Sequence, residues 1–198
     1  MIDNLILVRH GESEANAKRI LGGRLPYPLT ALGRRQARHL AQLLKNVKLS
    51  KIYSSPVRRA YDTASAVAKA KHIRVDVEEA FTETDVGPFV GKVLPKAAKK
   101  WKMNNPGYGE QFNDLKRRTV PAIERIIEKG KGNVMIVSHG DPLMSLVYHF
   151  IDYKPNGHHR FSMYPQYAAI TIVSFKSGYP RLLVFNYSGM VYRQLLFP

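Results

Sequence analysis

Short apolar segments alternate with longer amphipathic ones along most of the chain. Runs rich in Ile, Leu and Val predict five buried strands, at residues 4–8, 51–54, 134–138, 168–175 and 181–186. The spacing of apolar residues predicts four helices, at residues 31–44, from 56 to about 69, from about 109 to 129 and from 143 to about 150. Because strands that alternate with helices imply parallel pairing, the pattern predicts a layered α/β fold.

Local signals refine three of the helices and the last two strands. Thr30 is suited to cap the first helix. The apolar face of that helix is expected to comprise Leu32, Ala37, Leu40, Ala41 and Leu44. Ser55 followed by Pro56 predicts the start of the second helix, and Pro121 predicts a kink or break in the third. The last two strands, joined through residues 177–180, are expected to form an antiparallel hairpin at one edge of the sheet.

Residues 84–110 differ from the rest of the chain, since they are rich in glycine, proline and lysine. We interpret them as an excursion from the fold that holds one short basic helix around residues 95–103. Excursions above the carboxyl edge of a sheet often form lids and substrate walls. The length then suits a single domain, 1–198, with this lid-like excursion.

Composition narrows the class of protein. The chain is 44% hydrophobic and 23% charged, as expected of a globular protein, and it has no cysteine, which excludes disulfides and thiol catalysis. No apolar run has the length of a membrane span and no signal peptide precedes the first strand, so we expect a cytoplasmic protein without a membrane partner. The net charge of +16 suits a phosphate ester or a nucleic acid, although a solvated basic surface explains it equally well.

Side chains that can bind phosphate recur where the predicted strands end. Arg9 and His10 end the first strand, Arg59 opens the helix after the second, and His139 ends a later one. Because such ends share one edge of a parallel sheet, we expect these side chains to converge, with Glu83 beside them. Taken singly, each residue has a simpler explanation, as a core histidine, a solvated helix arginine or a surface glutamate.

Five pieces of the sequence occur in the order that a known family shows. They are Leu7–Asn16 with its Arg-His-Gly, Pro28–Ala37, Ile52–Ala64, Glu83 followed by Gly87, and Val137–Gly140. On these pieces, which span most of the chain, it resembles the histidine phosphatase superfamily, the group named for phosphoglycerate mutase. The resemblance implies a three-layer sandwich around a mostly parallel sheet with an antiparallel edge strand.

The resemblance also implies roles for the matched residues. His10 would be the nucleophile that becomes phosphorylated, and Glu83 the general acid that protonates the leaving oxygen and later activates water. The residues that bind phosphate would be Arg9, Asn16, Gly22, Gly23, Arg59 and His139. Such chemistry needs no metal and no cofactor, because arginine and histidine supply the positive charge. The adjacent His158 and His159 lie in a turn context and are interpreted as a loop or substrate-rim feature.

Three departures from the family pattern leave the substrate open. Gly87-Pro88-Phe89-Val90-Gly91 replaces a Gly-x-Trp-Glu-Gly motif, Pro26 stands where an aspartate is common, and Asp62 replaces a frequent glutamine. The short chain favours a phosphatase acting on a small phosphomonoester over a cofactor-dependent phosphoglycerate mutase. A non-catalytic basic scaffold or a nucleic-acid-binding module on this fold is a third alternative. It is disfavoured because nucleophile and acid are both present. The oligomeric state stays open, a homodimer included.

Overall fold

The computed structural model describes residues 2–93, 109–152 and 164–189. Within these residues, six strands form one sheet in the order β3-β2-β4-β1-β5-β6. The strands are β1 (Ile2–Arg9), β2 (Leu49–Ser54), β3 (Val75–Val77), β4 (Gly132–Ser138), β5 (Ile170–Ser174) and β6 (Arg181–Tyr187). The first four run parallel, whereas β5 pairs antiparallel with both β1 and β6. The predicted mostly parallel sheet is confirmed, with two antiparallel strands at its edge.

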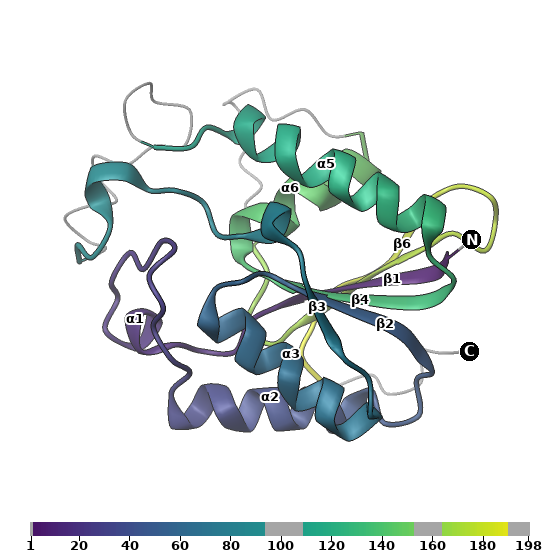
Figure 1. Cartoon of the computed structure of the whole chain (residues 1–198), viewed down its shortest axis with the longest axis horizontal. Coiled ribbons are helices and arrows are strands. Elements are labelled where there is room, and N and C mark those ends of the chain that lie inside the picture. The colour runs from purple at the N-terminus through teal and green to yellow at the C-terminus, as the bar shows by residue number, and fades with distance from the viewer. Residues whose placement is uncertain (1, 94–108, 153–163, 190–198) are drawn as a thin grey trace.

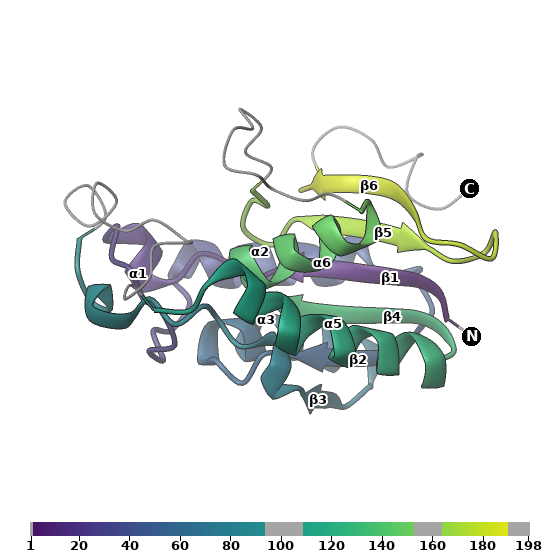
Figure 2. The ribbon, with the colours of Figure 1, turned by 90° about the horizontal axis from the view of Figure 1, so that it is seen from above.

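Helices cover both faces of this sheet, which confirms the three layers (Figures 1 and 2). One face carries α2 (Ala31–Leu43) and α3 (Arg58–Lys71), and the other carries α5 (Phe112–Lys129) and α6 (Gly140–Phe150). The short elements are α1 (Glu14–Ala17), η1 (Glu79–Phe81) and η2 (Gly87–Phe89). Among the described residues no helix combines the length and the apolarity that a bilayer span requires.

The central strand β1 shows why the sheet needs a helical layer on each side. Ile6 and Val8 pack into the core under α2 and α3, whereas Leu5 and Leu7 pack into the core under α5 and α6. All four side chains are almost fully buried. A strand that is apolar on both faces is typical of the inside of a parallel sheet.

The start of α2 is fixed by contact with the loop after β1. The hydroxyl of Thr30 accepts a hydrogen bond from the Gly33 N–H, which confirms the predicted cap. A Cβ on Gly33 would lie 2.0 Å from the Glu12 carbonyl oxygen, and one on Gly11 would lie 2.6 Å from the Gly33 oxygen. Only glycine allows this approach of the two backbones, so the helix supports the loop that carries His10.

The prediction that Leu32 faces the core is wrong, because its side chain is 41% exposed. The buried residues of α2 are Gly33, Ala37, Leu40 and Ala41. Their spacing defines the helix face toward the sheet, and Leu32 lies one residue outside that stripe. Leu32 lines a surface cavity instead.

Three helices also begin elsewhere than predicted: α3 at Arg58 instead of 56, α5 at Phe112 instead of about 109, and α6 at Gly140 instead of 143. The helix α3 begins at Arg58 after the N-cap Val57 and has no side-chain cap, because the Ser55 hydroxyl contacts His139 as well as the Val57 N–H. The helix α5 continues through Pro121, so the predicted break is wrong. Pro121 lies on the exposed side, while buried residues before and after it, Leu115 and Ile123, hold the helix against the core.

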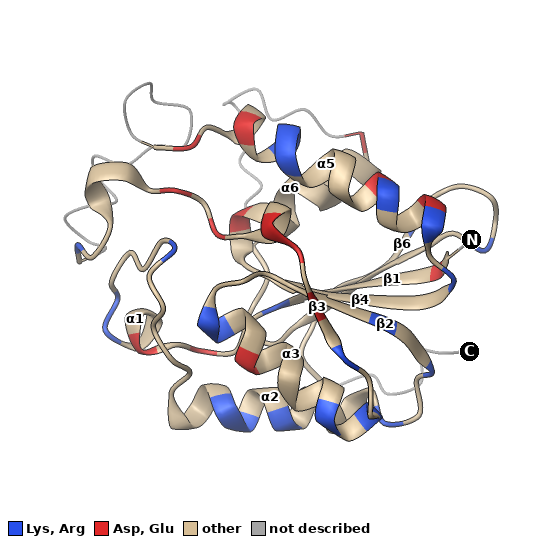
Figure 3. Cartoon of the chain, viewed as in Figure 1, with Lys and Arg blue, Asp and Glu red and all other residues tan. Residues whose placement is uncertain are grey.

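Strand β3 was not predicted, because it has only three residues and pairs with β2 at the sheet edge. The basic helix expected at 95–103 and the pair His158 and His159 lie outside the described residues. Lys and Arg recur along α2 and on α3 and α5 (Figure 3). In the described part of the chain, positive charge is therefore spread over both helical layers.

Candidate active site

The predicted site residues meet at a cavity of about 460 Å³ by the carboxyl edge of the parallel strands. The predicted residues that line it are Arg9, His10, Asn16, Gly22, Gly23, Arg59 and Glu83. His139 lies directly behind the wall, with its ring centroid 5.0 Å from that of His10. The two histidines are neighbours because β1 and β4 pair in parallel and both end at this edge. The structure thus brings all the predicted residues together.

His10 is held as a neutral imidazole with one nitrogen turned to the cavity. Its Nδ1 lies 2.7 Å from the Gly11 carbonyl oxygen, which can only accept, so Nδ1 carries the proton. Its Nε2 keeps a lone pair, which accepts a hydrogen bond from Arg59 Nε at 3.1 Å. Burial, and then the positive charges of Arg59 and Arg9, hold the pKa of His10 well below its ordinary value. A neutral imidazole with one unprotonated nitrogen can act as a nucleophile.

Arg59 is the buried cation at the centre of the site. Two of its nitrogens donate to the carbonyl oxygens of Gly23 at 2.8 Å and Leu25 at 3.1 Å, and Nη2 lies 3.5 Å from Glu83 Oε2. Gly23 therefore contributes a carbonyl that orients Arg59. The neighbouring Arg58 lies outside the cavity and pairs with Asp62 on the helix surface. Of the two consecutive arginines, Arg59 therefore faces the cavity and Arg58 the helix surface.

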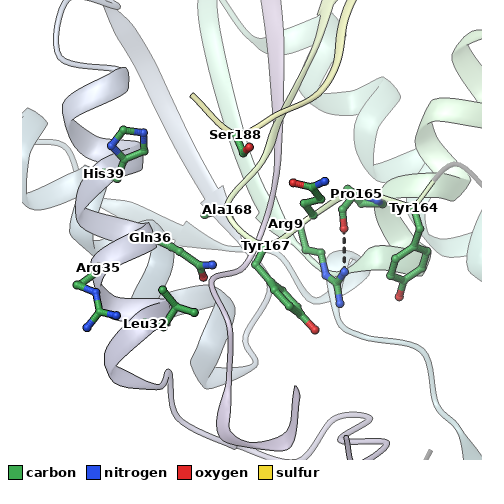
Figure 4. Close-up of a pocket in the computed structure, with 11 residues that line it drawn as sticks. Arg9, Leu32, Arg35, Gln36, His39, Tyr164, Pro165, Tyr167, Ala168 and Ser188 are labelled. Carbon is green, nitrogen blue, oxygen red and sulfur yellow. Dashed lines mark hydrogen bonds between the residues drawn. The ribbon is translucent and has the colours of Figure 1, made fainter. Parts of the chain in front are cut away.

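Arg9 is held between two aromatic rings that sequence reasoning missed. Its guanidinium carbon lies 4.7 Å from the Tyr164 ring centroid and 4.2 Å from that of Tyr167, and Nη1 donates to the Pro165 oxygen at 2.8 Å (Figure 4). Arg9 and both rings also border a second cavity of about 830 Å³ against α2. The signal in the sequence was the aromatic pair in Tyr164-Pro165-Gln166-Tyr167, just before a buried strand.

His139 is fully buried, and Ser55 fixes its orientation. The Ser55 hydroxyl oxygen lies 2.8 Å from His139 Nε2 and accepts from the Val57 N–H, and its own proton can be donated to Nε2. With Nε2 as acceptor, the one ring proton of neutral His139 is on Nδ1, which lies 3.4 Å from Glu83 Oε2. Burial and the nearby charge of Arg59 hold the pKa of His139 well below its ordinary value. The imidazole is thus a neutral donor.

Two buried donors at this wall have no hydrogen-bond partner among the described residues, namely His139 Nδ1 and Arg9 Nε. Unpaired buried donors are rare, because each carries the cost of its lost hydration. A bound oxyanion offers several acceptor oxygens at once. The arrangement therefore suits an anion with the charge and size of a phosphoryl group.

Two carboxyl groups, those of Glu83 and Asp141, also line the cavity. Glu83 Oε1 accepts from the Thr84 N–H at 2.9 Å, while Oε2 faces Arg59 and His139. Asp141, in the first turn of α6, lines the same cavity and was missed. Its position two residues after His139 was the available signal. Burial, and then the negative charge of Glu83, raise the pKa of Asp141 to about 7.

Asn16 lines the cavity, whereas none of the residues at the three departures from the family motif does. The Asn16 side-chain oxygen accepts from the N–H and the hydroxyl of Ser13, so Asn16 also completes the capping box of α1, whose N-cap is Ser13. Val86, near the altered motif, lines the cavity, whereas Val90 is 42% exposed. Asp62, the third departure, lies outside it with Arg58.

His10, Glu83 and His139 are the one metal-type cluster in the described part of the chain, with ligand atoms within 4.8 Å of one another. They fit a cation poorly, because the Arg59 guanidinium already contacts His10 Nε2 and Glu83 Oε2. His10 Nδ1 is also engaged by the Gly11 carbonyl. A permanent positive charge therefore occupies the place that a metal ion would take.

The fold and the site define an α/β protein with an anion-binding cavity at the carboxyl edge of its sheet. A model of the histidine phosphatase superfamily (branch 1) matches residues 5–188. The chain belongs to this superfamily. The structure of Bacillus stearothermophilus YhfR resembles it with a TM-score of 0.83 and 30% identity, over 98% of this chain and 99% of the other.

Curated relatives carry the names of both phosphatases and mutase-like proteins. Phosphoglycerate mutase-like protein 4 of Arabidopsis thaliana is 35% identical over 157 residues, which make up 72% of this chain and 68% of that protein. Putative phosphoserine phosphatase 2 of Hydrogenobacter thermophilus is 34% identical over 154 residues, 72% and 76% of the two chains. The chain also matches three mycobacterial proteins, of whose length it spans 43%.

Proposed function

We propose that this protein is a metal-independent phosphatase that hydrolyses a small phosphomonoester through a phosphohistidine at His10. The observation that carries the proposal is the Nε2 lone pair of His10, which is held free of protons beside two arginines. Phosphoryl transfer asks the protein for positioning and for positive charge around the equatorial oxygens, which Arg9, Arg59 and His139 can supply.

The first half of the reaction moves the phosphoryl group to His10. The Nε2 lone pair attacks phosphorus while the bond to the ester oxygen breaks. The leaving oxygen takes a proton from Glu83, which reaches the cavity beside Arg59.

The second half releases inorganic phosphate. Glu83, now a carboxylate, accepts a proton from a water molecule as the water oxygen attacks phosphorus. The bond to Nε2 breaks, and the lone pair of His10 is restored. Splitting one displacement into two in this way lowers the barrier of each step.

A phosphoglycerate mutase is the alternative that uses the same histidine, with a second hydroxyl in place of water. We retain this alternative because one relative carries the name phosphoglycerate mutase-like protein. We would incubate the protein with p-nitrophenyl phosphate, sugar phosphates, nucleotides, phosphoserine and 3-phosphoglycerate from acidic to neutral pH. Release of inorganic phosphate supports the proposal. Conversion of 3-phosphoglycerate to 2-phosphoglycerate that a bisphosphate stimulates would replace it with the mutase.

Replacing Glu83 by glutamine is expected to slow an alkyl phosphate by about 10²-fold or more, because general acid catalysis contributes about that much to a poor leaving group. A p-nitrophenolate ion leaves without a proton, so p-nitrophenyl phosphate is expected to be slowed far less. The measurement is kcat/KM for both substrates, with the surface variant Glu124→Gln as control. Equal slowing of the two would remove Glu83 from the role of acid.

The remaining expectations belong to the same proposal. The partner is a small phosphorylated substrate, and the location is cytoplasmic. If the third alternative, a basic scaffold or nucleic-acid-binding module, were correct, the protein would release no phosphate from any substrate in the panel. It would instead retain labelled nucleic acid in a salt-dependent manner.

A further inference from the structure

A second carboxyl group, Asp141, reaches the cavity and has no part in the proposed mechanism. It lies in the first turn of α6, two residues beyond His139, and contributes to the same cavity wall as Glu83. Its Oδ2 accepts a hydrogen bond from the Thr84 hydroxyl at 3.1 Å, and the Tyr164 hydroxyl also bonds to it. Thr84 directly follows Glu83 in the chain. Its hydroxyl therefore connects the segment that carries Glu83 to Asp141 on α6.

The groups that face Asp141 determine its protonation. Glu83 contributes a negative charge, Arg9 a positive charge, and Thr84 and Tyr164 hydrogen bonds. The pKa of Tyr164 lies well above its ordinary value, chiefly through burial, so its hydroxyl keeps its proton. Burial and the nearby charge of Glu83 disfavour ionisation of Asp141, and its pKa of about 7 leaves part of the population protonated at neutral pH.

We propose that Asp141 is a second acid of this site and shares with Glu83 the protonation of the leaving group. This inference rests on the proposed function. As the bond from phosphorus to the ester oxygen breaks, the Asp141 carboxyl proton passes to that oxygen and Asp141 is left as a carboxylate. When water attacks the phosphohistidine, this carboxylate takes the water proton back, so protons balance over the cycle.

The decisive experiment compares Asp141→Asn in two backgrounds with an alkyl phosphate as substrate. Asparagine keeps the shape and the hydrogen-bonding capacity of the residue, but it has no acidic proton. In the Glu83→Gln background, the second substitution is expected to lower kcat/KM by a further factor of about ten or more, since one acid then remains to be removed. The loss for p-nitrophenyl phosphate is expected to be much smaller. If the double variant equals Glu83→Gln on the alkyl phosphate, Asp141 is not an acid.

The pH profile supplies a readout that a purely structural role would not move. In Glu83→Gln, activity on the alkyl phosphate is expected to fall as pH rises through the pKa of Asp141, which lies lower than in the wild type because the Glu83 charge that raises it is gone. Adding Thr84→Val to Glu83→Gln removes a hydrogen bond that lowers the pKa of Asp141. The fall in activity is therefore expected at a higher pH than in Glu83→Gln alone. An unshifted profile on adding Thr84→Val would contradict the proposal.

Stability gives a third test, independent of turnover. Because folding raises the pKa of Asp141 from its ordinary value to about 7, the folded state binds more protons between these values. The wild type therefore loses stability as pH rises toward 7, and Asp141→Asn does not. The difference in Tm between variant and wild type should grow in favour of the variant up to about pH 7 and then level off. Asp62→Asn, whose carboxyl pairs with Arg58 on the surface, is the matched control.

The outcomes separate this inference from the proposed function. If His10 and Glu83 variants behave as a phosphohistidine mechanism requires while Asp141→Asn slows both substrates equally, only the inference fails. If His10 proves dispensable, the proposed function fails first.

Discussion

Replacing His10 by alanine is expected to lower kcat/KM for every phosphomonoester by at least about 10⁴-fold, because removing a nucleophile abolishes the covalent route. The loss should be similar for substrates with good and with poor leaving groups, since the reaction of either begins with attack by Nε2. This behaviour contrasts with that of the acid variants, whose effect depends on the leaving group. His10→Ala thus tests the central step of the proposed mechanism.

The measurement combines steady-state kinetics with rapid quenching. The wild type, mixed with a ³²P-labelled substrate and quenched, should yield a labelled protein whose label is lost in acid and kept in alkali. His10→Ala should yield no such label. A matched control is His149→Ala, because His149 lies near the end of α6 and pairs weakly with Glu124. Undiminished turnover by His10→Ala would exclude His10 as the nucleophile.

Replacing Arg59 by methionine is expected to lower kcat/KM by about 10²- to 10³-fold, the usual effect of removing one preorganised group that stabilises charge in the transition state. Methionine fills part of the buried volume but donates no hydrogen bond. The Gly23 and Leu25 carbonyl oxygens lose their donor, so a lower Tm is expected as well.

The same substitution is expected to change the pH dependence in a definite direction. The Arg59 charge lowers the pKa values of both His10 and His139. Without it these values rise, and a larger fraction of His10 is protonated and inactive at mildly acidic pH. The acid limb of kcat/KM should therefore move to higher pH in Arg59→Met.

Arg58→Met is the control for Arg59→Met, because the two arginines are consecutive and only Arg59 reaches the cavity. The control should keep both the activity and the pH profile of the wild type. Measuring Tm for each variant separates loss of folding from loss of chemistry. An acid limb that stays in place in a folded Arg59→Met would show that Arg59 does not set the protonation of His10.

Much of the fold could be predicted from the sequence because the local signals agree with the tertiary structure. Apolar runs such as Leu5–Val8 are buried on both faces, and the cap at Thr30 is present. Errors arose where packing overrides a local rule. Pro121 does not end α5, because the buried residues on either side outweigh one lost hydrogen bond. Leu32 is apolar but lies off the stripe that Gly33 and Ala37 define.

The strand-end residues of the site could be predicted because parallel strands bring their carboxyl ends together whatever the rest of the chain does. Residues that complete the site from other directions could not. Tyr164 and Tyr167 reach Arg9 from the segment before β5, and an aromatic pair before a strand does not by itself identify an arginine partner. Ser55 resembled a helix cap, although its hydroxyl orients His139. Asp141 gains its significance from Glu83, which is distant in sequence.

The burial of His10 has a consequence for the stereochemistry at phosphorus. His10 is only 1% exposed and lines the cavity, so in the proposed mechanism the leaving group and the incoming water share one approach, opposite the imidazole. Each in-line displacement inverts the configuration at phosphorus, and two in succession restore it. A phosphoryl group made chiral with oxygen isotopes should therefore emerge with retained configuration when it is transferred to an acceptor alcohol. Direct attack by the acceptor would give the mirror-image product.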